Sequence, residues 1–379
     1  MSAGRIIALM GQRDEPADGV ADYCDWLGIS LGKFGYRFDT FRVNWPEVGW
    51  RAALAELETK SLEWRGQWVL LQYTVLAWSK RGFPVHVPRI ISRLRKNGIH
   101  CGIVFHDFHP FGGDRIVDRV RHYYQLRILR RLYQCASFAS FTAPLQKVTW
   151  LPSPAPKAIF IPIGANCPEP TGCSSSSEGP LTVAVFCVTS DHRMAHEVSD
   201  IGYALKRAES VLGTLRLVVF GRGSREASSA LRAEFSGTRV DLTTLGLLSP
   251  ADVTRTLACA DVMLFVRGYM SSRRGSAIAG VACGLPIVGF ESVDTAWPLT
   301  EAGLVLAPEN NREALSAALM NVLSDPALRQ TLRERSRHAQ KQYFSWTAIA
   351  QQFATRLRGV APPSSAEPAS KTAVSARSS

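Results

Sequence analysis

Residues 271–290 read SSRRGSAIAGVACGLPIVGF, and they follow a short apolar run at 262–266. A run of this kind is typical of a buried parallel strand. Ser272 can cap a helix whose apolar side chains repeat on one face, and the Gly-Leu-Pro step ends that helix before a second strand-like run at 287–290. The stretch therefore predicts strand, loop, helix and strand, which is the repeating unit of a parallel α/β sheet.

The loop of this unit carries two adjacent arginines, Arg273 and Arg274, followed by Gly275. The free amides at the N-terminus of a helix, together with the loop at the carboxyl end of a parallel strand, form a natural anion site. Residues Ser272 to Gly275 are therefore candidate phosphate-binding residues. A solvated basic turn is the alternative that the spacing alone leaves open.

The composition is that of a globular protein with room for about two domains, since 46% of its 379 residues are hydrophobic. No apolar run approaches the roughly 20 residues that a membrane span requires, and the amino end breaks into charge too early for a secretory signal. The eight cysteines include no CxxC pair and no histidine at metal-ligand spacing. We therefore expect a cytoplasmic protein with reduced cysteines and no bound metal.

The formal charge of +12 is concentrated between residues 80 and 131, where twelve basic residues accompany three aspartates. Two segments there, RIISRLRKNG and RIVDRVRHYYQLRILRRLYQ, mix arginine with aliphatic and aromatic residues. This mixture predicts helices on an anionic membrane surface, at the inner face of the membrane; the rival partner, nucleic acid, has no compact binding motif to support it. The lipid-facing arginines would be Arg89, Arg93, Arg95, Arg127, Arg130 and Arg131, with shallow insertion by Tyr123, Tyr124, Ile128 and Leu132.

Strand-like and helix-like segments alternate through both halves of the chain, which predicts two doubly wound α/β domains facing each other across a cleft. The stretch TGCSSSSEGP between them is too rich in Gly, Ser and Pro for regular structure and is typical of a linker. We divide the chain into a first Rossmann-like domain at 1–170, the linker at 171–180, a second Rossmann-like domain at 181–345, a last helix at 346–359 and a disordered tail at 360–379.

A candidate diphosphate loop in the second domain, GRGSRE, follows the strand-like LRLVVF. Gly221 and Gly223 would let the backbone approach a diphosphate, and Arg222 adds charge. The motif is not a dinucleotide fingerprint, because Glu226 stands where the last glycine would be. A simple tight turn is the alternative.

The first domain offers two candidate loops. ADGVADY places Asp18 and Gly19 before a helix, where a glycine allows close approach of the donor; an ordinary capped helix start is the alternative. HDFHP places His106 and Asp107 after the strand-like GIVF. A histidine beside a carboxylate can orient an acceptor hydroxyl or take its proton, so these two are the candidate catalytic residues. The alternative is a histidine whose hydrogen bonds are merely satisfied within a loop.

These segments resemble a known family. The run from ADVMLFV through RRGSAIAGVACGLPIVGF, with VVFGRG before it and EAGLVLAP after it, is similar to the C-terminal domain of family 4 of the GT-B glycosyltransferases. ADGVADY, GIVFHD and IFIPIGAN are similar to the acceptor domain of that family. The resemblance implies a nucleotide-activated sugar in the second domain, an acceptor in the first, and a closing helix that returns to the first domain.

The sequence departs from the family pattern at a pair of glutamates. Ser271 and Ala279 stand where most members carry two glutamates eight positions apart, and the later glutamate reaches the ribose. A subset of similar enzymes has an Arg-Arg pair at this helix start, so the resemblance assigns the diphosphate to Arg273 and Arg274. Arg193 is the nearest candidate for the basic residue that the family carries after the first strand of this domain.

The resulting hypothesis is a glycosyltransferase that moves a sugar from a nucleotide-diphosphate donor to a saccharide or lipid-linked acceptor, in polysaccharide or glycoconjugate biosynthesis. The nucleotide sugar would be a co-substrate, with no cofactor and no metal, and the resemblance implies retention of anomeric configuration. Two alternatives stay open: a catalytically silent partner subunit, which the missing glutamates suggest, and a nucleotide-sugar epimerase.

Overall fold

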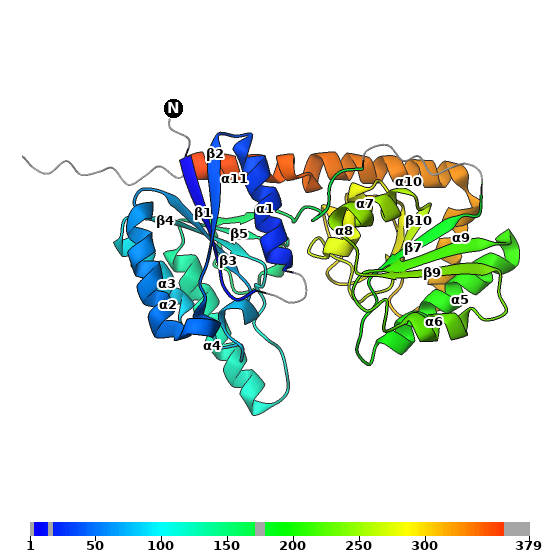
Figure 1. Cartoon of the computed structure of the whole chain (residues 1–379), viewed down its shortest axis with the longest axis horizontal. Helices are drawn as coiled ribbons and strands as arrows, with labels where there is room; N and C mark the ends of the chain where they lie inside the picture. Colours follow the sequence, from blue (N-terminus) through cyan, green and yellow to red (C-terminus); the bar gives the residue numbers. More distant parts are fainter. Residues whose placement is uncertain (1–3, 14–17, 171–178, 360–379) are drawn as a thin grey trace, which may run out of the picture.

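The structure, a computed structural model of the chain, describes residues 4–13, 18–170 and 179–359. These residues form two α/β domains, each built on a six-stranded parallel sheet (Figure 1). The prediction of two doubly wound domains is therefore confirmed. The tail expected at 360–379 and most of the linker expected at 171–180 lie outside the described residues.

The first sheet has the strand order β2-β1-β3-β4-β5-β6. Successive side chains of β1 are buried on opposite faces: Ile6 packs in one core cluster and Ile7 in another. The order reverses between β1 and β3, so the switch point of this domain lies there. The strands are β1 Gly4–Met10, β2 Tyr36–Arg42, β3 Trp68–Tyr73, β4 His100–Phe105, β5 Phe138–Phe141 and β6 Ala158–Phe160.

Helices cover both faces of the first sheet. The helices α2, α3 and α4 pack on one face, and α1 and the last helix, α11, pack on the other. The N-terminal half of α4 extends away from the body of the domain (Figure 1). The helices are α1 Gly19–Gly32, α2 Trp45–Ser61, α3 Val87–Lys96, α4 Ile116–Cys135 and α11 Trp346–Gly359.

The second sheet has the order β12-β11-β10-β7-β8-β9, with its switch point between β7 and β10. The helices α5, α6 and α9 cover one face, and α7 and α8 the other. The strands are β7 Thr182–Phe186, β8 Leu215–Phe220, β9 Val240–Gly246, β10 Val262–Phe265, β11 Ile287–Phe290 and β12 Leu304–Ala307. The helices are α5 Met194–Leu212, α6 Ser228–Glu234, α7 Pro250–Ala258, α8 Gly275–Ala282, α9 Arg312–Ser324 and α10 Pro326–Ala339.

The end of the described chain joins the two domains. From α10 it continues through a π-helical turn, Gln340–Phe344, into α11, which lies against the first domain (Figure 1). The indole Nε1 of Trp346 donates to the carbonyl oxygen of Ala165 (2.7 Å), in the segment that leads out of the first sheet. No helix in the described ranges combines the length and apolarity needed to cross a bilayer.

Two strands of the first sheet, β5 and β6, are too short for a local sequence pattern to predict them. They are four and three residues long, so they are too short to show a two-residue alternation. The structure places them at the edge of the sheet, beyond β4.

Two predictions about individual residues are wrong. Ser272 does not cap α8; Arg274 is the N-cap residue, and the Ser272 hydroxyl donates to the carbonyl oxygen of Thr142 in the other domain (3.3 Å). Ile128 and Leu132 cannot enter a membrane, because both are buried in the core of the first domain. The second half of α4 faces the sheet, so its aliphatic residues pack there.

Candidate functional site

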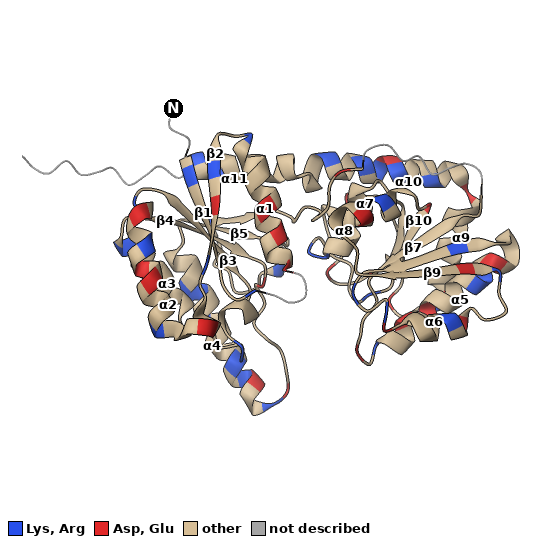
Figure 2. Cartoon of the chain, in the orientation of Figure 1, with Lys and Arg blue, Asp and Glu red and all other residues tan. Residues whose placement is uncertain are grey.

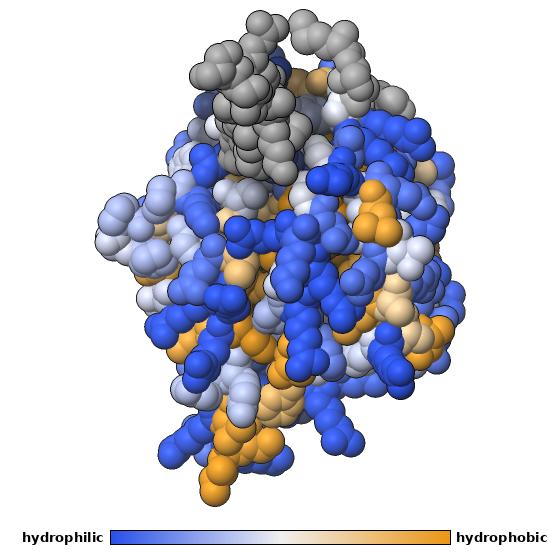
Figure 3. All heavy atoms as spheres, turned by 90° about the vertical axis from the view of Figure 1, so that its left-hand side faces the viewer, coloured by the Kyte–Doolittle hydropathy of each residue, from blue (hydrophilic) through white to orange (hydrophobic). Residues whose placement is uncertain are grey.

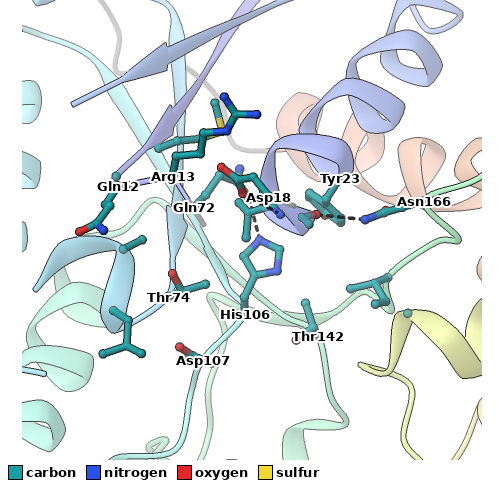
Figure 4. A pocket seen from close by; sticks show the side chains of 18 of the residues that line it. Gln12, Arg13, Asp18, Tyr23, Gln72, Thr74, His106, Asp107, Thr142 and Asn166 are labelled. Atoms are coloured by element: carbon teal, nitrogen blue, oxygen red, sulfur yellow. Dashed lines mark hydrogen bonds between the residues drawn. The ribbon is translucent and has the colours of Figure 1, made fainter. Parts of the chain in front are cut away.

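A cavity of about 490 Å³ lies at the switch point of the first sheet, closed on one side by the start of α8 from the second domain (Figure 4). Ligands of open α/β sheets bind at such points, because the loops after the two central strands diverge there. The polar residues that line it are Gln12, Arg13, Asp18, Arg42, Gln72, Thr74, His106, Asp107, Thr142, Asn166 and Arg273.

His106 follows β4, and its Nε2 lies 2.9 Å from Oε1 of Gln72 on β3 (Figure 4). The Gln72 amide nitrogen donates to the carbonyl oxygen of Leu70 (3.3 Å), so Gln72 Oε1 is the acceptor and His106 Nε2–H the donor. Tyr23 of α1 packs edge-on against the imidazole at 5.0 Å. The arrangement holds the tautomer protonated at Nε2 and leaves the Nδ1 lone pair as an acceptor.

The imidazole of His106 is neutral near pH 7. Burial lowers the pKa of His106 to about 4, because the imidazolium would lose its hydration there. A neutral imidazole is the form that can take a proton from a hydroxyl group. Nδ1 of His106 can therefore accept a hydrogen bond or a proton from a hydroxyl group in the cavity.

Asp107 does not orient His106. Its Oδ2 accepts from the backbone N–H of Val75 (2.9 Å), which fixes the loop after β3 against the end of β4. Asp107 still lines the cavity, so its carboxylate faces the space beside the imidazole. The hydrogen-bond partner of the His106 imidazole is therefore Gln72.

Asp18 and Gly19 form the wall at the start of α1. One carboxylate oxygen of Asp18 accepts from two backbone amides in the first turn (3.1 and 3.2 Å), and the other accepts from Nη2 of Arg42 (2.9 Å). The Gly19 carbonyl oxygen accepts from the side-chain amide of Asn166 (3.1 Å). The alternative of a capped helix start thus describes Asp18, although both residues also line the cavity.

Arg273 reaches the cavity from the second domain. Its guanidinium lies 4.8 Å from the ring centre of Phe108 in the first domain, and Nη2 lies 3.5 Å from the carboxylate of Asp294. Gly275, the first residue of α8, lines the same cavity. One arginine of the pair and the N-terminus of α8 therefore face the side of the site that carries His106.

Arg274 has different surroundings from Arg273. Its Nε donates to the carbonyl oxygen of Tyr269 (3.1 Å), and it does not line the cavity formed by the described residues. Burial lowers the pKa of Arg274, and the neighbouring Arg267, Arg273 and Arg193 lower it further. These four arginines repel one another, and an anion bound among them would relieve the repulsion.

The glycines of GRGSRE hold two loops of the second domain together. Gly221 and Gly223 have positive φ angles (87° and 78°), and a Cβ on Gly223 would collide with the carbonyl group of Val188. Val188 N–H donates to the carbonyl oxygen of Arg222 (3.0 Å). These contacts match the tight-turn alternative, and none of the three predicted residues lines the described cavity.

Arg193 lies at the N-cap of α5, and its side chain is paired with Asp191 (3.0 Å) and half exposed.

The cavity brings together six of the twelve predicted site residues and leaves out the other six. The six that line it are Asp18, Gly19, His106, Asp107, Arg273 and Gly275. The six outside its lining are Arg193, Gly221, Arg222, Gly223, Ser272 and Arg274.

Several lining residues were not predicted from the sequence, among them Gln72, Tyr23 and Asn166. Gln72 gave a readable signal, because it is a polar residue near the end of an otherwise apolar strand, WVLLQY. Tyr23 gave none, since an aromatic residue in an amphipathic helix normally indicates the core. No group of three or more His, Cys, Asp and Glu residues in the described ranges is arranged to hold a metal ion.

Comparison with known proteins identifies the second domain. Residues 185–325 match the family model of glycosyl transferases group 1, a span that includes Arg273, Arg274 and α8. No curated protein matches the chain.

Solved structures match nearly the whole chain. HepE of Anabaena, in complex with UDP and glucose, is 14% identical with a TM-score of 0.64, and the match covers 94% of this chain and 100% of that one. Sucrose-phosphate synthase from Thermosynechococcus elongatus is 19% identical (TM-score 0.65; 94% and 99% covered). A glycosyltransferase from Rickettsia africae is 12% identical (TM-score 0.66; 95% and 99% covered).

At identities this low, the solved structures show a shared fold. The family model matches by sequence and covers residues of the second domain. The chain has the GT-B fold, and residues 185–325 of its second domain match the model of the glycosyl transferases group 1.

Proposed function

We propose that this protein is a glycosyltransferase that moves a sugar from a nucleotide-diphosphate donor to a saccharide or lipid-linked acceptor. The observation that carries the proposal is that Arg273 and Gly275, within the matched glycosyl transferases group 1 region, line the same cavity as His106 of the first domain. Donor and acceptor groups held on the two sides would meet in that cavity.

On the donor side, the diphosphate is bound by Arg273, Arg274 and the free amides of α8. Negative charge grows on the diphosphate as its bond to the sugar breaks, and fixed donors aimed at that position stabilise the transition state. Arg273 is already held in place by Phe108 and Asp294, so its positioning costs little at the moment of reaction.

On the acceptor side, His106 takes the proton of the attacking hydroxyl at Nδ1. Gln72 holds the ring through Nε2, and the low pKa keeps Nδ1 unprotonated at neutral pH. Asp107, beside it, accepts a hydrogen bond from another hydroxyl of the acceptor. Asp18 acts indirectly, because its carboxylate caps α1 and pairs with Arg42.

The finer parts of the proposal come from the resemblance to family 4. They are retention of anomeric configuration and a role in polysaccharide or glycoconjugate biosynthesis. Transfer without a metal or a cofactor is proposed because fixed arginines and helix amides can stabilise the leaving diphosphate. Chelation of divalent ions should leave the initial rate unchanged, and NMR of the product should show the anomeric configuration of the donor.

We also place the protein at an anionic membrane surface, at the inner face of the membrane. Arginines recur along α4 (Figure 2), and the N-terminal half of this helix exposes apolar side chains. This combination favours binding at the interface of a bilayer, where charge attracts the helix and apolar residues insert.

A panel of nucleotide sugars tests the function directly. A donor that binds should raise the melting temperature by mass action, and that donor is then incubated with acceptors and analysed by mass spectrometry. A product larger by one sugar supports transfer. A donor that raises the melting temperature but is never turned over would indicate a silent partner subunit. A donor that is isomerised when no acceptor is present would indicate an epimerase.

A further inference from the structure

A second cavity, of about 430 Å³, lies beside the first one in the N-terminal domain. Leu76 and Asp107 line both cavities, so they form the partition between them. We propose that the second cavity binds the phosphate of an acceptor carried on an apolar chain. The inference rests on the proposed transfer reaction, because it names the class of acceptor that reaches His106.

The walls of this second cavity are built by buried polar contacts. Gln125 of α4 is 1% exposed; its Oε1 accepts from the Phe111 N–H (2.6 Å), and its Nε2 donates to the Gly82 carbonyl oxygen (2.7 Å). One side chain therefore holds the two loops that face each other across the cavity. Such a connection keeps the cavity open in a fixed shape.

Arg121 forms the floor between the two loops. Its guanidinium lies 4.8 Å from the ring centre of Phe111 and 5.8 Å from that of Phe83, and it is paired with Asp118 (2.8 Å). Its Nε donates to the carbonyl oxygen of Arg81 (3.2 Å). Because its charge is matched by Asp118, Arg121 serves mainly to position the loop that carries Arg81.

The charge of the cavity comes from Lys80 and Arg81, which are exposed at its rim. Within the described part of the chain, neither side chain forms an ion pair. The nearby acidic lining residue, Asp107, is held by a backbone amide. Asp107 offsets one of these two positive charges, so the cavity keeps a net positive charge that would attract a phosphate.

An apolar surface continues from the cavity along α4. Five exposed residues with relative exposures of 44–82% follow the spacing i, i+1, i+4, i+7 and i+8, which places them on one face of the helix: Ile116, Val117, Val120, Tyr123 and Tyr124. Tyr124 packs edge-on against Phe83 (6.1 Å), which joins this face to the loop before the cavity. Apolar side chains gather at the lower tip of the molecule, where α4 extends (Figure 3).

The two features fit the two parts of one amphiphile. A phosphate at Lys80 and Arg81 would have its apolar chain along the exposed face of α4, and its sugar would extend over Asp107 toward His106. A free saccharide would use neither feature. The membrane would then deliver the acceptor from the side on which α4 projects.

Binding of three probes to the full chain tests the inference: dodecyl phosphate, dodecyl maltoside and inorganic phosphate, each below its micellar concentration where it has one. Dodecyl phosphate should bind at least tenfold more tightly than either of the others. The double variant Lys80→Gln/Arg81→Gln should lose at least tenfold in affinity for dodecyl phosphate, and so should Val120→Asp. Matched controls are Arg51→Gln/Lys96→Gln for exposed charge on α2 and α3 and Ile29→Asp for an exposed apolar residue on α1; both should bind like the parent.

The outcomes separate this inference from the donor function. Equal affinity of parent and double variant for dodecyl phosphate overturns the phosphate site, and equal binding of dodecyl maltoside overturns the need for an anion. If the double variant loses as much affinity for phosphatidylglycerol vesicles as for dodecyl phosphate, the ligand is a bilayer headgroup and the inference is wrong. UDP binding by the same proteins reports on the donor site, because Lys80, Arg81 and Val120 do not line the first cavity.

Discussion

Arg273 and Arg274 are adjacent in the sequence, yet only Arg273 faces the cavity shared by the two domains. Arg273 is stacked on Phe108, whereas Arg274 lies among other arginines and donates to a backbone carbonyl group. In the proposed donor site, the two side chains would therefore approach a diphosphate from different sides. Each can supply a charge-assisted hydrogen bond without competing for the same oxygen.

We expect Arg273→Ala and Arg274→Ala each to weaken UDP binding by about 1.5–3 kcal/mol, the range for hydrogen bonds to charged groups. Isothermal titration measures the effect, and the melting temperature checks that each variant is folded. Arg255→Ala is the matched control, because Arg255 is 71% exposed on α7 and paired with Asp252. If both variants bind UDP like the parent, the arginines form a solvated basic turn.

His106→Ala should reduce kcat by roughly 10²–10⁴-fold, the range for loss of a general acid or base, with little change in donor affinity. Gln72→Leu should give part of the same loss, because it frees the ring that Gln72 orients. Steady-state rates and UDP titration on the same samples separate the two quantities. An unchanged kcat in His106→Ala would remove the residue from the reaction.

The low pKa of His106 also predicts how stability depends on pH. The unfolded imidazole takes up a proton below about pH 6.5, while the folded one resists protonation down to about pH 4. Stability should therefore fall as the pH decreases from 6.5 to 4, and this share of the fall should be absent in His106→Gln. Urea unfolding at several pH values measures it, with His192→Gln, an 86% exposed position, as the control.

At the scale of elements, α4 changes its environment along its length. Its second half buries Ile128, Leu129 and Leu132 in the core, while the first half exposes its apolar residues. Its arginines, five against a single aspartate, extend over both halves. In α3, by contrast, Arg93 is paired with Glu58 of α2 (3.3 Å) and the apolar residues are buried, so α4 is the better lipid-facing helix.

Vesicle binding by α4 should require anionic lipid and decrease with added salt. Replacing Arg127, Arg130 and Arg131 by Gln should cost roughly 1 kcal/mol of attraction for each arginine. Ile116→Asp should weaken binding through loss of insertion, and Val211→Asp, a 70% exposed position on α5, is the control. Co-sedimentation decides the point: equal recovery with neutral and anionic vesicles contradicts a membrane surface, and tighter binding to nucleic acid favours the rival partner.

At the scale of the whole molecule, α11 is part of the core of the first domain although it follows the second domain in sequence. Ile349 and Phe353 are fully buried among residues of β1 and α1. The ring of Phe353 packs edge-on against that of Phe138 in β5, with 6.4 Å between the ring centres. The folding of the first domain therefore depends on residues more than 180 positions beyond its last strand. This connection also limits how the domains can move relative to each other.

Phe353→Ala should destabilise the first domain by about 3–5 kcal/mol, because it leaves a cavity in a packed core. Urea unfolding followed by tryptophan fluorescence should show an earlier transition. Gln351→Ala, at an exposed position of the same helix, should leave the transition unchanged. Equal transitions for the two variants would show that α11 contributes little to the first domain.

The sequence by itself determined the two doubly wound sheets, most of the helices and the loops at the carboxyl ends of the strands. These features follow from local patterns: apolar runs, their periodicity and the Gly and Pro residues that end them. His106, Arg273 and Gly275 could be selected for the same reason, because each lies in a loop after a strand or at the start of a helix.

Only the tertiary structure decided which side chains meet. Gln72 lies 34 residues from His106, and Ser272 lies 130 residues from Thr142, so no local pattern links them. Likewise, a helical period shows which residues share a face but not what covers it, and therefore Ile128 and Ile116 could not be told apart as core and surface. These contacts depend on how the sheets and domains pack, which is set by the free energy of the whole fold and not by any one segment.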